Sequence, residues 1–201
     1  MPELFEVKRI KDYLIDANIL NQTITAVSFQ NLGERILKQS SVDLFEQLLL
    51  GNHIKSIQTK AKYTLFCLNY GSILLHYRFT GIAHVDGVPY GNRLNTIYSL
   101  PIINLNPKHI RFSFHFSNNK VLNYYDTRCL SHMHIDKYHQ SFNNYPHLIK
   151  LSDDMLTYIM PCYDEFIHGY QHLKCDLKTF LLDQTKPPSG IGNYLANEIC
   201  A

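Results

Sequence analysis

Residues 181–184 read Leu-Leu-Asp-Gln, and residues 190–198 read Gly-Ile-Gly-Asn-Tyr-Leu-Ala-Asn-Glu. Gly190 and Gly192 let the backbone turn tightly and come close to a neighbour just before a helix. The N–H groups at a helix start attract an anion, and the Asn193 side chain adds a donor. Two interpretations are open: the turn binds a phosphate of DNA, or it is a tight connection between two helices.

The segments around this turn predict a helical C-terminal part. Residues 176–182 have the pattern of a short helix, and a last helix is expected from Asn193 to the end of the chain. Upstream, Ser152 is placed to cap a helix over residues 153–168, which Pro161 should kink or break and Gly169 should end. Residues 142–146 resemble a linker in composition.

The region before this linker reads as β-structure. Residues 111–116 alternate polar and aromatic side chains, as expected for a strand with one buried face. Antiparallel strands packed as a sandwich fit this region better than βαβ units, because no long helices alternate with the strands. The expected strands are residues 23–29, 54–58, 64–68, 72–77, 111–116 and 121–124, with a short helix or turn at 42–50.

The N-terminus predicts an amphipathic helix over residues 3–20, with apolar residues at three- and four-residue steps. Removal of Met1 would leave Pro2 as a secondary amine with an α-amino pKa near ~8, which can act as a nucleophile. Glu3 lies beside it and can move protons. The alternative is that Pro2 simply starts a helix with an acidic first turn.

Composition limits the class of protein. With 201 residues, 45% hydrophobic and 12% aromatic, the chain can build a real core. A net charge of +2 neither requires nor excludes a nucleic-acid partner. The five cysteines are scattered, without a Cys-x-x-Cys pair, which argues against disulfides and against a cysteine-built zinc site. Without a signal sequence or a long apolar run, a soluble intracellular protein is expected.

Five short motifs, in order along the chain, resemble the formamidopyrimidine-DNA glycosylase/endonuclease VIII family. The helical stretch at 181–198 resembles the family's L-L-D-Q…G-I-G-N-x-x-x-x-E string, which forms its helix-two-turn-helix. Like the family, the chain begins Pro-Glu after Met1. The other three motifs are Lys60-Ala61-Lys62-Tyr63, His76-Tyr77-Arg78-Phe79-Thr80-Gly81 and Asp126-Thr127-Arg128-Cys129-Leu130, which resemble R-G-K-Y, H-L-x-M-S-G and D-x-R-x-F.

The resemblance implies a bifunctional DNA glycosylase and abasic-site lyase. In this chemistry Pro2 attacks C1′ of a damaged nucleotide, and the cationic iminium that results drives strand cleavage by β- and then δ-elimination. Glu3 would handle protons on the opening sugar ring. Lys62 completes the implied catalytic set, and no metal or organic cofactor is required by this chain.

The resemblance also implies how DNA is held. Lys62, His76 and Asn193 match positions that bind phosphate, although an exposed Lys62 and a structural His76 are the ordinary alternatives. Enzymes that extrude a nucleotide must fill the space it leaves. Phe79, Arg128 and Leu130 match the void-filling positions. The alternative for Phe79 and Leu130 is that they belong to the core of the sheet.

The chain departs from the family pattern at several places. Phe5 replaces the second Pro of P-E-x-P-E, Ala61 replaces a Gly, and residues 129–131 replace R-F-G. The family continues beyond the last helix into a β-hairpin finger that often holds zinc. This chain stops at Ala201, so we expect either a truncated form or a protein without the finger, with weaker binding to lesion DNA.

The sequence therefore predicts an α+β protein with an N-terminal catalytic β-sandwich (residues 1–140), flanked by the first helix, and a helix-two-turn-helix DNA-binding domain (residues 141–201). The expected function is base-excision repair of double-stranded DNA with damaged bases or abasic sites. The alternative is a weakly active or inactive relative that only binds DNA. We further expect a cytoplasmic, DNA-associated monomer without a membrane partner. Lesion preference is not encoded in the motifs.

Overall fold

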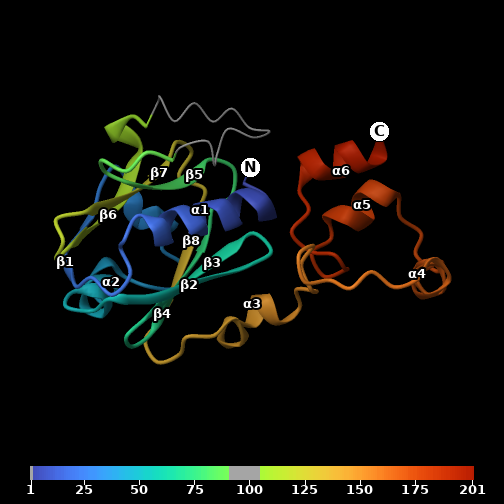
Figure 1. Ribbon diagram of the computed structural model, residues 1–201, viewed down its shortest axis with the longest axis horizontal. Coiled ribbons are helices and arrows are strands. Elements are labelled where there is room, and N and C mark those ends of the chain that lie inside the picture. Colours follow the sequence, from blue (N-terminus) through green and yellow to red (C-terminus); the bar gives the residue numbers. More distant parts are fainter. Residues whose placement is uncertain (1, 91–104) are drawn as a thin grey trace.

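The computed structural model describes residues 2–90 and 105–201 (Figure 1). Within these residues the strands form two four-stranded antiparallel sheets, ordered β1-β6-β7-β5 and β2-β3-β4-β8. The strands are β1 Ile24–Phe29, β2 Ile54–Lys60, β3 Tyr63–Leu68, β4 Ser72–His76, β5 Gly81–Val85, β6 Ile110–Phe116, β7 Val121–Asp126 and β8 His132–Asp136. The two sheets pack face to face, so the predicted β-sandwich is confirmed.

The core between the sheets is rich in aromatic side chains. Phe112 and Phe114 on β6 are almost fully buried, as their alternation in the sequence predicts. The Phe112 ring stacks on Tyr124 of β7 with centroids 4.9 Å apart, and Phe45 packs edge-on against Phe112. Such aromatic pairs add to the stabilisation that area burial already provides.

Helix α1 (Leu4–Asp16) closes one open side of the sandwich. It packs against β2, the edge of one sheet, and β5, the edge of the other (Figure 1). Its apolar stripe of Val7, Ile10 and Leu14 is at most 1% exposed. The helix ends earlier than the predicted residue 20, because Asn18 adopts a left-handed conformation with φ +55°.

The opposite side of the sandwich is closed by short elements. Helix α2 (Val42–Leu49) is capped by Ser41, whose hydroxyl accepts the Leu44 N–H. The Lys38 N–H donates to the Met133 carbonyl of β8, which ties this segment to the second sheet. Three 3₁₀ turns are found among the described residues of the sandwich region and its exit: η1 Gly33–Ile36, η4 Pro107–His109 and η5 Phe142–Asn144.

A small helical part follows the sandwich and lies apart from it in Figure 1, in orange and red. Its core cluster contains Phe180, Leu181, Ile191 and Ala196, each at most 9% exposed. Its helices are α4 Tyr163–Tyr170, α5 Leu177–Leu182 and α6 Asn193–Cys200, and helix α3 Pro146–Ile149 lies in the segment that precedes it. Helices α5 and α6 flank the turn at residues 183–192, which gives the predicted helix-two-turn-helix arrangement.

The segment between the two parts packs on the sandwich. Tyr145 and Leu148 cover Leu65 and Leu74 on the outer face of the second sheet. The Tyr145 hydroxyl is within 2.9 Å of the Ser72 hydroxyl. The domain boundary predicted at residues 140 and 141 stays a prediction, because residues beyond it share a hydrophobic cluster with β3 and β4.

The helix predicted over residues 153–168 is wrong in its first half. Ser152 does not cap a helix; its N–H donates to the Gln184 carbonyl. The Met155 N–H donates to Ser189, and the Ser189 N–H donates back to Asp153. These backbone groups pair with the 184–189 loop instead of forming helical bonds, and α4 starts only at Tyr163, after Pro161.

Two strands, β5 and β8, were not among the predicted strands. The β8 sequence His132-Met-His-Ile-Asp136 alternates, but three of its five residues are polar or titratable on the outward face. Pairing with β4, and burial of Met133 to 0% exposure, fix it as an edge strand. In the described ranges, 2–90 and 105–201, the helices lack the combination of length and apolar character needed to cross a membrane.

Candidate functional site

The start of α1 places Pro2 and Glu3 at the side of the sandwich that faces the helical part (Figure 1). Both residues are buried, and Glu3 is only 2% exposed. The Glu6 carboxylate accepts the Glu3 backbone N–H at 2.9 Å, which satisfies one of the donors that a helix start leaves unpaired. Met1 lies outside the described residues, so its removal stays a prediction.

The Glu3 side chain reaches across to the first turn of α6. Its carboxylate accepts the backbone N–H groups of Gly192 and Tyr194, both at 3.0 Å, and of Leu195 at 3.4 Å. A negative charge at this position also interacts favourably with the positive end of the helix dipole. The anion held at this helix start is therefore the protein's own carboxylate.

The two glycines of the turn are needed for this approach. A Cβ at Gly192 would lie 2.3 Å from Glu3 Oε1, far inside contact distance. Gly190 has φ +96°, and a Cβ there would lie 2.9 Å from Leu4 Cβ, while its carbonyl accepts the Leu4 N–H at 3.2 Å. Gly190 and Gly192 thus let the start of α1 sit directly on the start of α6.

Lys62 lies at the tip of the β2–β3 hairpin and is 8% exposed, so the alternative of an ordinary exposed lysine is wrong. Burial lowers the pKa of the Lys62 ammonium, and the nearby Glu3 carboxylate acts in the opposite direction. The preceding Ala61 has φ +49°, a left-handed conformation. The Ala61 N–H donates to Asp154 Oδ2 at 3.3 Å, which connects the hairpin to the segment before α4.

His76 ends β4 directly opposite Tyr63, with the two ring centroids 4.5 Å apart. Burial, together with the nearby Arg78 and Lys62 cations, lowers the pKa of His76 to about 3. Its Nδ1 accepts the Arg78 N–H at 3.1 Å. The ring is therefore neutral at pH 7, with Nε2 carrying the proton as a hydrogen-bond donor.

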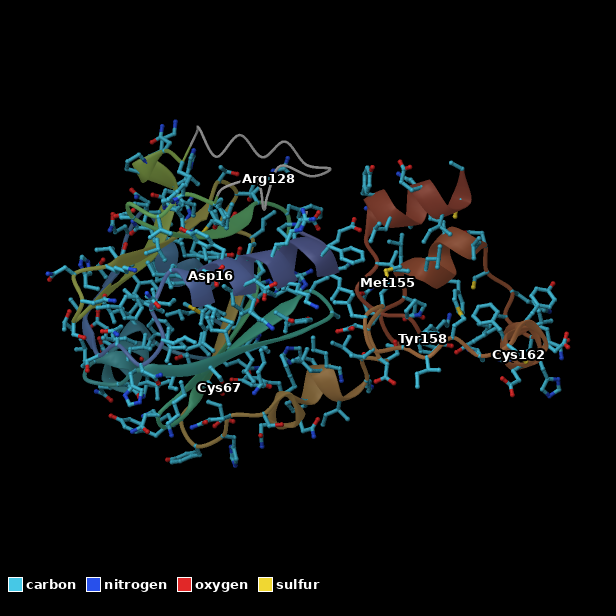
Figure 2. The ribbon with its side chains drawn as sticks, in the orientation of Figure 1. Asp16, Cys67, Arg128, Met155, Tyr158 and Cys162 are labelled. Carbon is cyan, nitrogen blue, oxygen red and sulfur yellow. The ribbon has the colours of Figure 1, made fainter. Side chains whose placement is uncertain are left out.

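The three predicted void-filling residues lie on two loops of the sandwich. Phe79, in the β4–β5 loop, is 47% exposed, and Leu130, in the β7–β8 loop, is 43% exposed. The alternative that these two residues belong to the core is therefore wrong. Arg128 is also exposed, and Figure 2 shows it at the edge of the sandwich.

Asn193 is the first residue of α6 and is exposed. It lies next to Gly192, whose N–H binds Glu3, so the predicted phosphate contact and the Glu3 anchor share one turn. Figure 2 shows Met155 between the sandwich and helices α5 and α6, and Tyr158 below α5 on the stretch that leads to α4.

Among the residues that the structure describes, no group of three or more His, Cys, Asp and Glu side chains is arranged to hold a metal ion. The His134 and His147 rings lie near each other, with centroids 5.0 Å apart. The absence of a cofactor from this chain stays a prediction.

Three important side chains have a role in the structure that the sequence does not predict. Glu6 stabilises the helix start, and the Glu-x-x-Glu spacing of residues 3–6 is the signal for it. Asp154 contacts the Lys62 hairpin and had been placed in a helix. Asp126 begins the motif that resembles D-x-R-x-F, and the structure gives it a role that the motif does not predict: it is completely buried and accepts several hydrogen bonds.

The fold and the site together define a class: an α+β protein whose N-terminal Pro-Glu pair is anchored on a helix-two-turn-helix, beside a lysine on a β-hairpin. The family model described as the formamidopyrimidine-DNA glycosylase N-terminal domain matches residues 1–133. The chain therefore belongs to the formamidopyrimidine-DNA glycosylase family.

Curated relatives extend the similarity over the whole chain. The formamidopyrimidine-DNA glycosylase of Mycoplasma genitalium is 32% identical over 200 residues, covering 99% of this chain and 63% of the relative. That of Ureaplasma parvum is 33% identical over 207 residues, with 99% and 66% covered. That of Listeria innocua is 28% identical over 201 residues, with 100% and 65% covered. The chain thus spans about two thirds of the length of these relatives.

Solved structures share the fold. The Lactococcus lactis Fpg in complex with DNA containing an abasic site matches with a TM-score of 0.74 and 19% identity, over 98% of this chain and 66% of that one. MutM in complex with DNA containing carbocyclic 8-oxo-G matches with the same TM-score and 20% identity, again over 98% and 66%. At these identities the likeness establishes the α+β architecture alone.

Proposed function

We propose that this protein excises damaged bases from double-stranded DNA and then cleaves the strand at the resulting abasic site. The observation that carries the proposal is the position of Pro2 beside Glu3. The Glu3 carboxylate is hydrogen-bonded to the first turn of α6, and its negative charge opposes the effect of burial, which lowers the pKa of the nearby Lys62 ammonium. Family membership, and the glycosylase names of the relatives, support the same activity.

In the proposed reaction, removal of Met1 exposes the secondary amine of Pro2. Its nitrogen attacks C1′ of the damaged nucleotide, the glycosidic bond breaks, and the base leaves with a proton. Opening of the sugar ring gives an iminium between C1′ and the Pro2 nitrogen. An iminium formed from a secondary amine has no N–H proton left to lose, so it stays cationic and acidifies the C2′ hydrogen. Loss of that hydrogen breaks the C3′–O bond, and a second elimination breaks the C5′–O bond.

Glu3 has two parts in this proposal. It handles the proton of the sugar oxygen as the ring opens. Its hydrogen bonds to the Gly192, Tyr194 and Leu195 N–H groups also fix the first turn of α1, so the nucleophile beside it starts from a defined position. The buried ammonium of Lys62 supplies positive charge next to the phosphate that leaves.

DNA is proposed to bind between the sandwich and the helical part. Lys62, the Nε2–H of neutral His76 and the exposed amide of Asn193 bind phosphates of the damaged strand. Phe79, Arg128 and Leu130, all exposed, enter the duplex where the nucleotide has left. Some solved structures of the same fold contain DNA with an abasic site, a ligand compatible with this arrangement.

Borohydride trapping on abasic-site DNA tests the proposal. Borohydride reduces the iminium to a stable amine, so the wild-type protein, with Met1 removal verified by mass spectrometry, should give a covalent adduct that maps to Pro2. Pro2→Gly should strongly reduce the adduct. Pro107→Gly, which changes an exposed proline at a distant 3₁₀ turn, is the matched control and should trap like wild type.

The outcomes separate the candidate functions. The primary amine of Gly at position 2 can also form an imine, so the position of the adduct decides: a full adduct in Pro2→Gly that maps to a residue other than the N-terminal one would remove Pro2 from the role of nucleophile. A wild-type protein that binds abasic DNA without any adduct would instead be the non-catalytic DNA-binding relative. Glycosylase assays on a panel of damaged oligonucleotides would then define the lesion preference. We also propose a cytoplasmic, DNA-associated monomer, to be checked by cell fractionation and by size-exclusion chromatography with light scattering.

A further inference from the structure

Two loops of the sandwich carry the proposed void-filling residues. Residues 77–80 join β4 to β5 and present Phe79, and residues 127–131 join β7 to β8 and present Arg128 and Leu130. The loops are about 50 residues apart in the sequence and belong to strands of both sheets. Each loop contains a non-glycine residue in the left-handed region, Arg78 and Cys129, both with φ +52°. Such a conformation is costly and persists only where surrounding contacts hold the backbone in place.

A single buried carboxylate holds the two loops together. Asp126 is 0% exposed at the end of β7. Its Oδ1 accepts the Thr80 hydroxyl of the first loop and the Arg128 N–H of the second at 3.1 Å. Its Oδ2 accepts the Ser131 N–H at 2.8 Å and lies 2.7 Å from the Ser131 hydroxyl, which donates to it. Hydrogen bonds to an ionised acceptor are stronger than neutral ones.

Two further bonds cross between the loops. The Arg128 N–H also points at the Thr80 hydroxyl oxygen, at 3.3 Å. The Tyr124 hydroxyl donates to Ser131 Oγ at 2.6 Å, and Ser131 Oγ lies 3.1 Å from the Tyr77 carbonyl at the base of the first loop. The Ser131 side chain of the second loop therefore contacts both the first loop, at Tyr77, and strand β7, at Tyr124 and Asp126.

The backbone beneath the carboxylate is fixed as well. Arg111 of β6, itself 6% exposed, donates from Nε to the Asp126 carbonyl at 2.6 Å. Its Nη2 reaches the Thr127 carbonyl at 3.4 Å, and its Nη1 donates to the Asn31 carbonyl. The polar network thus extends from the first sheet into the start of the second loop, and its buried polar groups are satisfied.

We propose that Thr80, Asp126 and Ser131 form a two-loop clamp that makes Phe79, Arg128 and Leu130 a single preformed wedge for the lesion site. This rests on the proposed function. Thr80 and Asp126 are positioning residues: they touch no DNA, and they act by keeping three side chains from two loops in one arrangement. A wedge ordered before binding avoids the entropy cost of ordering each loop on the DNA.

The coupling can be measured without DNA, because the chain contains no tryptophan. Leu130→Trp places the sole tryptophan of the chain in the second loop, and Thr80→Val removes a hydroxyl from the first loop while keeping the shape of the side chain. Thr80→Val should lower the anisotropy of Trp at 130 and raise its quenching by acrylamide. Thr80→Ser, which keeps the hydroxyl, should restore both.

Ser113→Ala is the matched control. It removes a buried hydroxyl that donates to Asn123 Oδ1 at 2.5 Å, between β6 and β7 and outside the two loops. It should cost stability without changing the Trp signal. An unchanged signal in Thr80→Val, or the same change in Ser113→Ala, overturns the clamp. Thr80→Val is preferred to Asp126→Asn, because loss of the buried carboxylate threatens folding itself.

Binding to duplex DNA supplies the second readout, with native Phe79 and Leu130. Thr80→Val should weaken binding to DNA with an abasic-site analogue about fivefold to tenfold and leave binding to undamaged DNA unchanged, with Thr80→Ser close to wild type. Equal weakening on both DNAs contradicts a role in the wedge. If the wild-type protein shows no preference for the abasic analogue, the proposed function fails, and the tryptophan readout still decides whether the loops are coupled.

Discussion

At the scale of single residues, the Glu3 carboxylate makes contacts that the sequence does not predict. The turn at residues 190–193 was expected either to bind phosphate or to connect two helices tightly. In the structure, the Gly192 N–H of this turn donates to the Glu3 carboxylate. Glu3 is 189 positions away from Gly192 in the sequence. The phosphate contact proposed for this turn then falls to the exposed Asn193 side chain.

Lys62→Ala tests the phosphate assignment at the hairpin. If the Lys62 ammonium neutralises one phosphate, the slope of log affinity against log salt concentration should become shallower by about one unit. Fluorescence anisotropy of labelled duplex DNA over a salt series measures this slope. Lys55→Ala, an exposed lysine of β2, is the control. The same slope in wild type and Lys62→Ala would place Lys62 away from the phosphates.

His76 should make stability depend on pH. Its pKa is lowered from 6.5 to about 3, so between these values the unfolded state binds more protons than the folded state. The contribution is complete above pH 6.5 and is lost as pH falls, by up to about 1.4 kcal/mol per pH unit. Urea unfolding at pH 7 and pH 5 should show a smaller loss for His76→Gln than for wild type. His115→Gln, an exposed histidine of β6, should behave like wild type; parallel losses in all three proteins would contradict the assignment.

At the scale of elements, the segment of residues 152–158 shows how tertiary pairing overrides a local signal. A Ser followed by two acidic residues is a common helix start. Here Asp154 is 7% exposed and turns inward, where its carboxylate accepts the Ala61 N–H at 3.3 Å and the Leu156 N–H at 3.1 Å. Through the hydrogen bond to Ala61, the segment of residues 152–158 holds the tip of the β2–β3 hairpin that carries Lys62.

Asp154→Ala should therefore destabilise the protein by about 1–3 kcal/mol, because it leaves the buried Ala61 N–H without an acceptor. Chemical denaturation measures the loss, and hydrogen exchange should show faster exchange at Ala61 and Leu156. Asp153→Ala changes the exposed neighbour and should be close to neutral. Equal effects of the two substitutions would mean that charge, and not the contact with the hairpin, is what matters.

At the scale of the whole molecule, the sandwich and the helical part meet at a few specific contacts. These are the Glu3 bonds to α6, the Leu4 N–H bond to Gly190, and the Asp154 bond to the β2–β3 hairpin. All three lie beside Pro2 or Lys62. The position of the proposed nucleophile therefore depends on how the two parts are joined.

Gly192→Ala tests this dependence. The added Cβ would lie 2.3 Å from Glu3 Oε1, so Glu3 must move away from α6. We expect a loss of about 1–3 kcal/mol in unfolding free energy and a reduced yield of borohydride adduct. Gly169→Ala in α4, where a Cβ meets no atom within 4 Å, should instead stabilise by about 0.5–1 kcal/mol and leave trapping intact. A full yield of borohydride adduct with Gly192→Ala would show that the contact between Glu3 and α6 does not position Pro2.

The sequence by itself determined the class of fold, the order of the main strands and the candidate residues Pro2, Glu3, Lys62 and Asn193. These depend on alternation, helix periodicity and short motifs, which are local properties of the chain. Tertiary structure decided that Glu3 binds α6, that residues 152–155 pair with the 184–189 loop instead of forming a helix, and that Asp126 joins two loops. Each of these is a hydrogen bond between groups that are distant in sequence. A buried donor or acceptor must find a partner, and only the folded chain determines which partner is within reach.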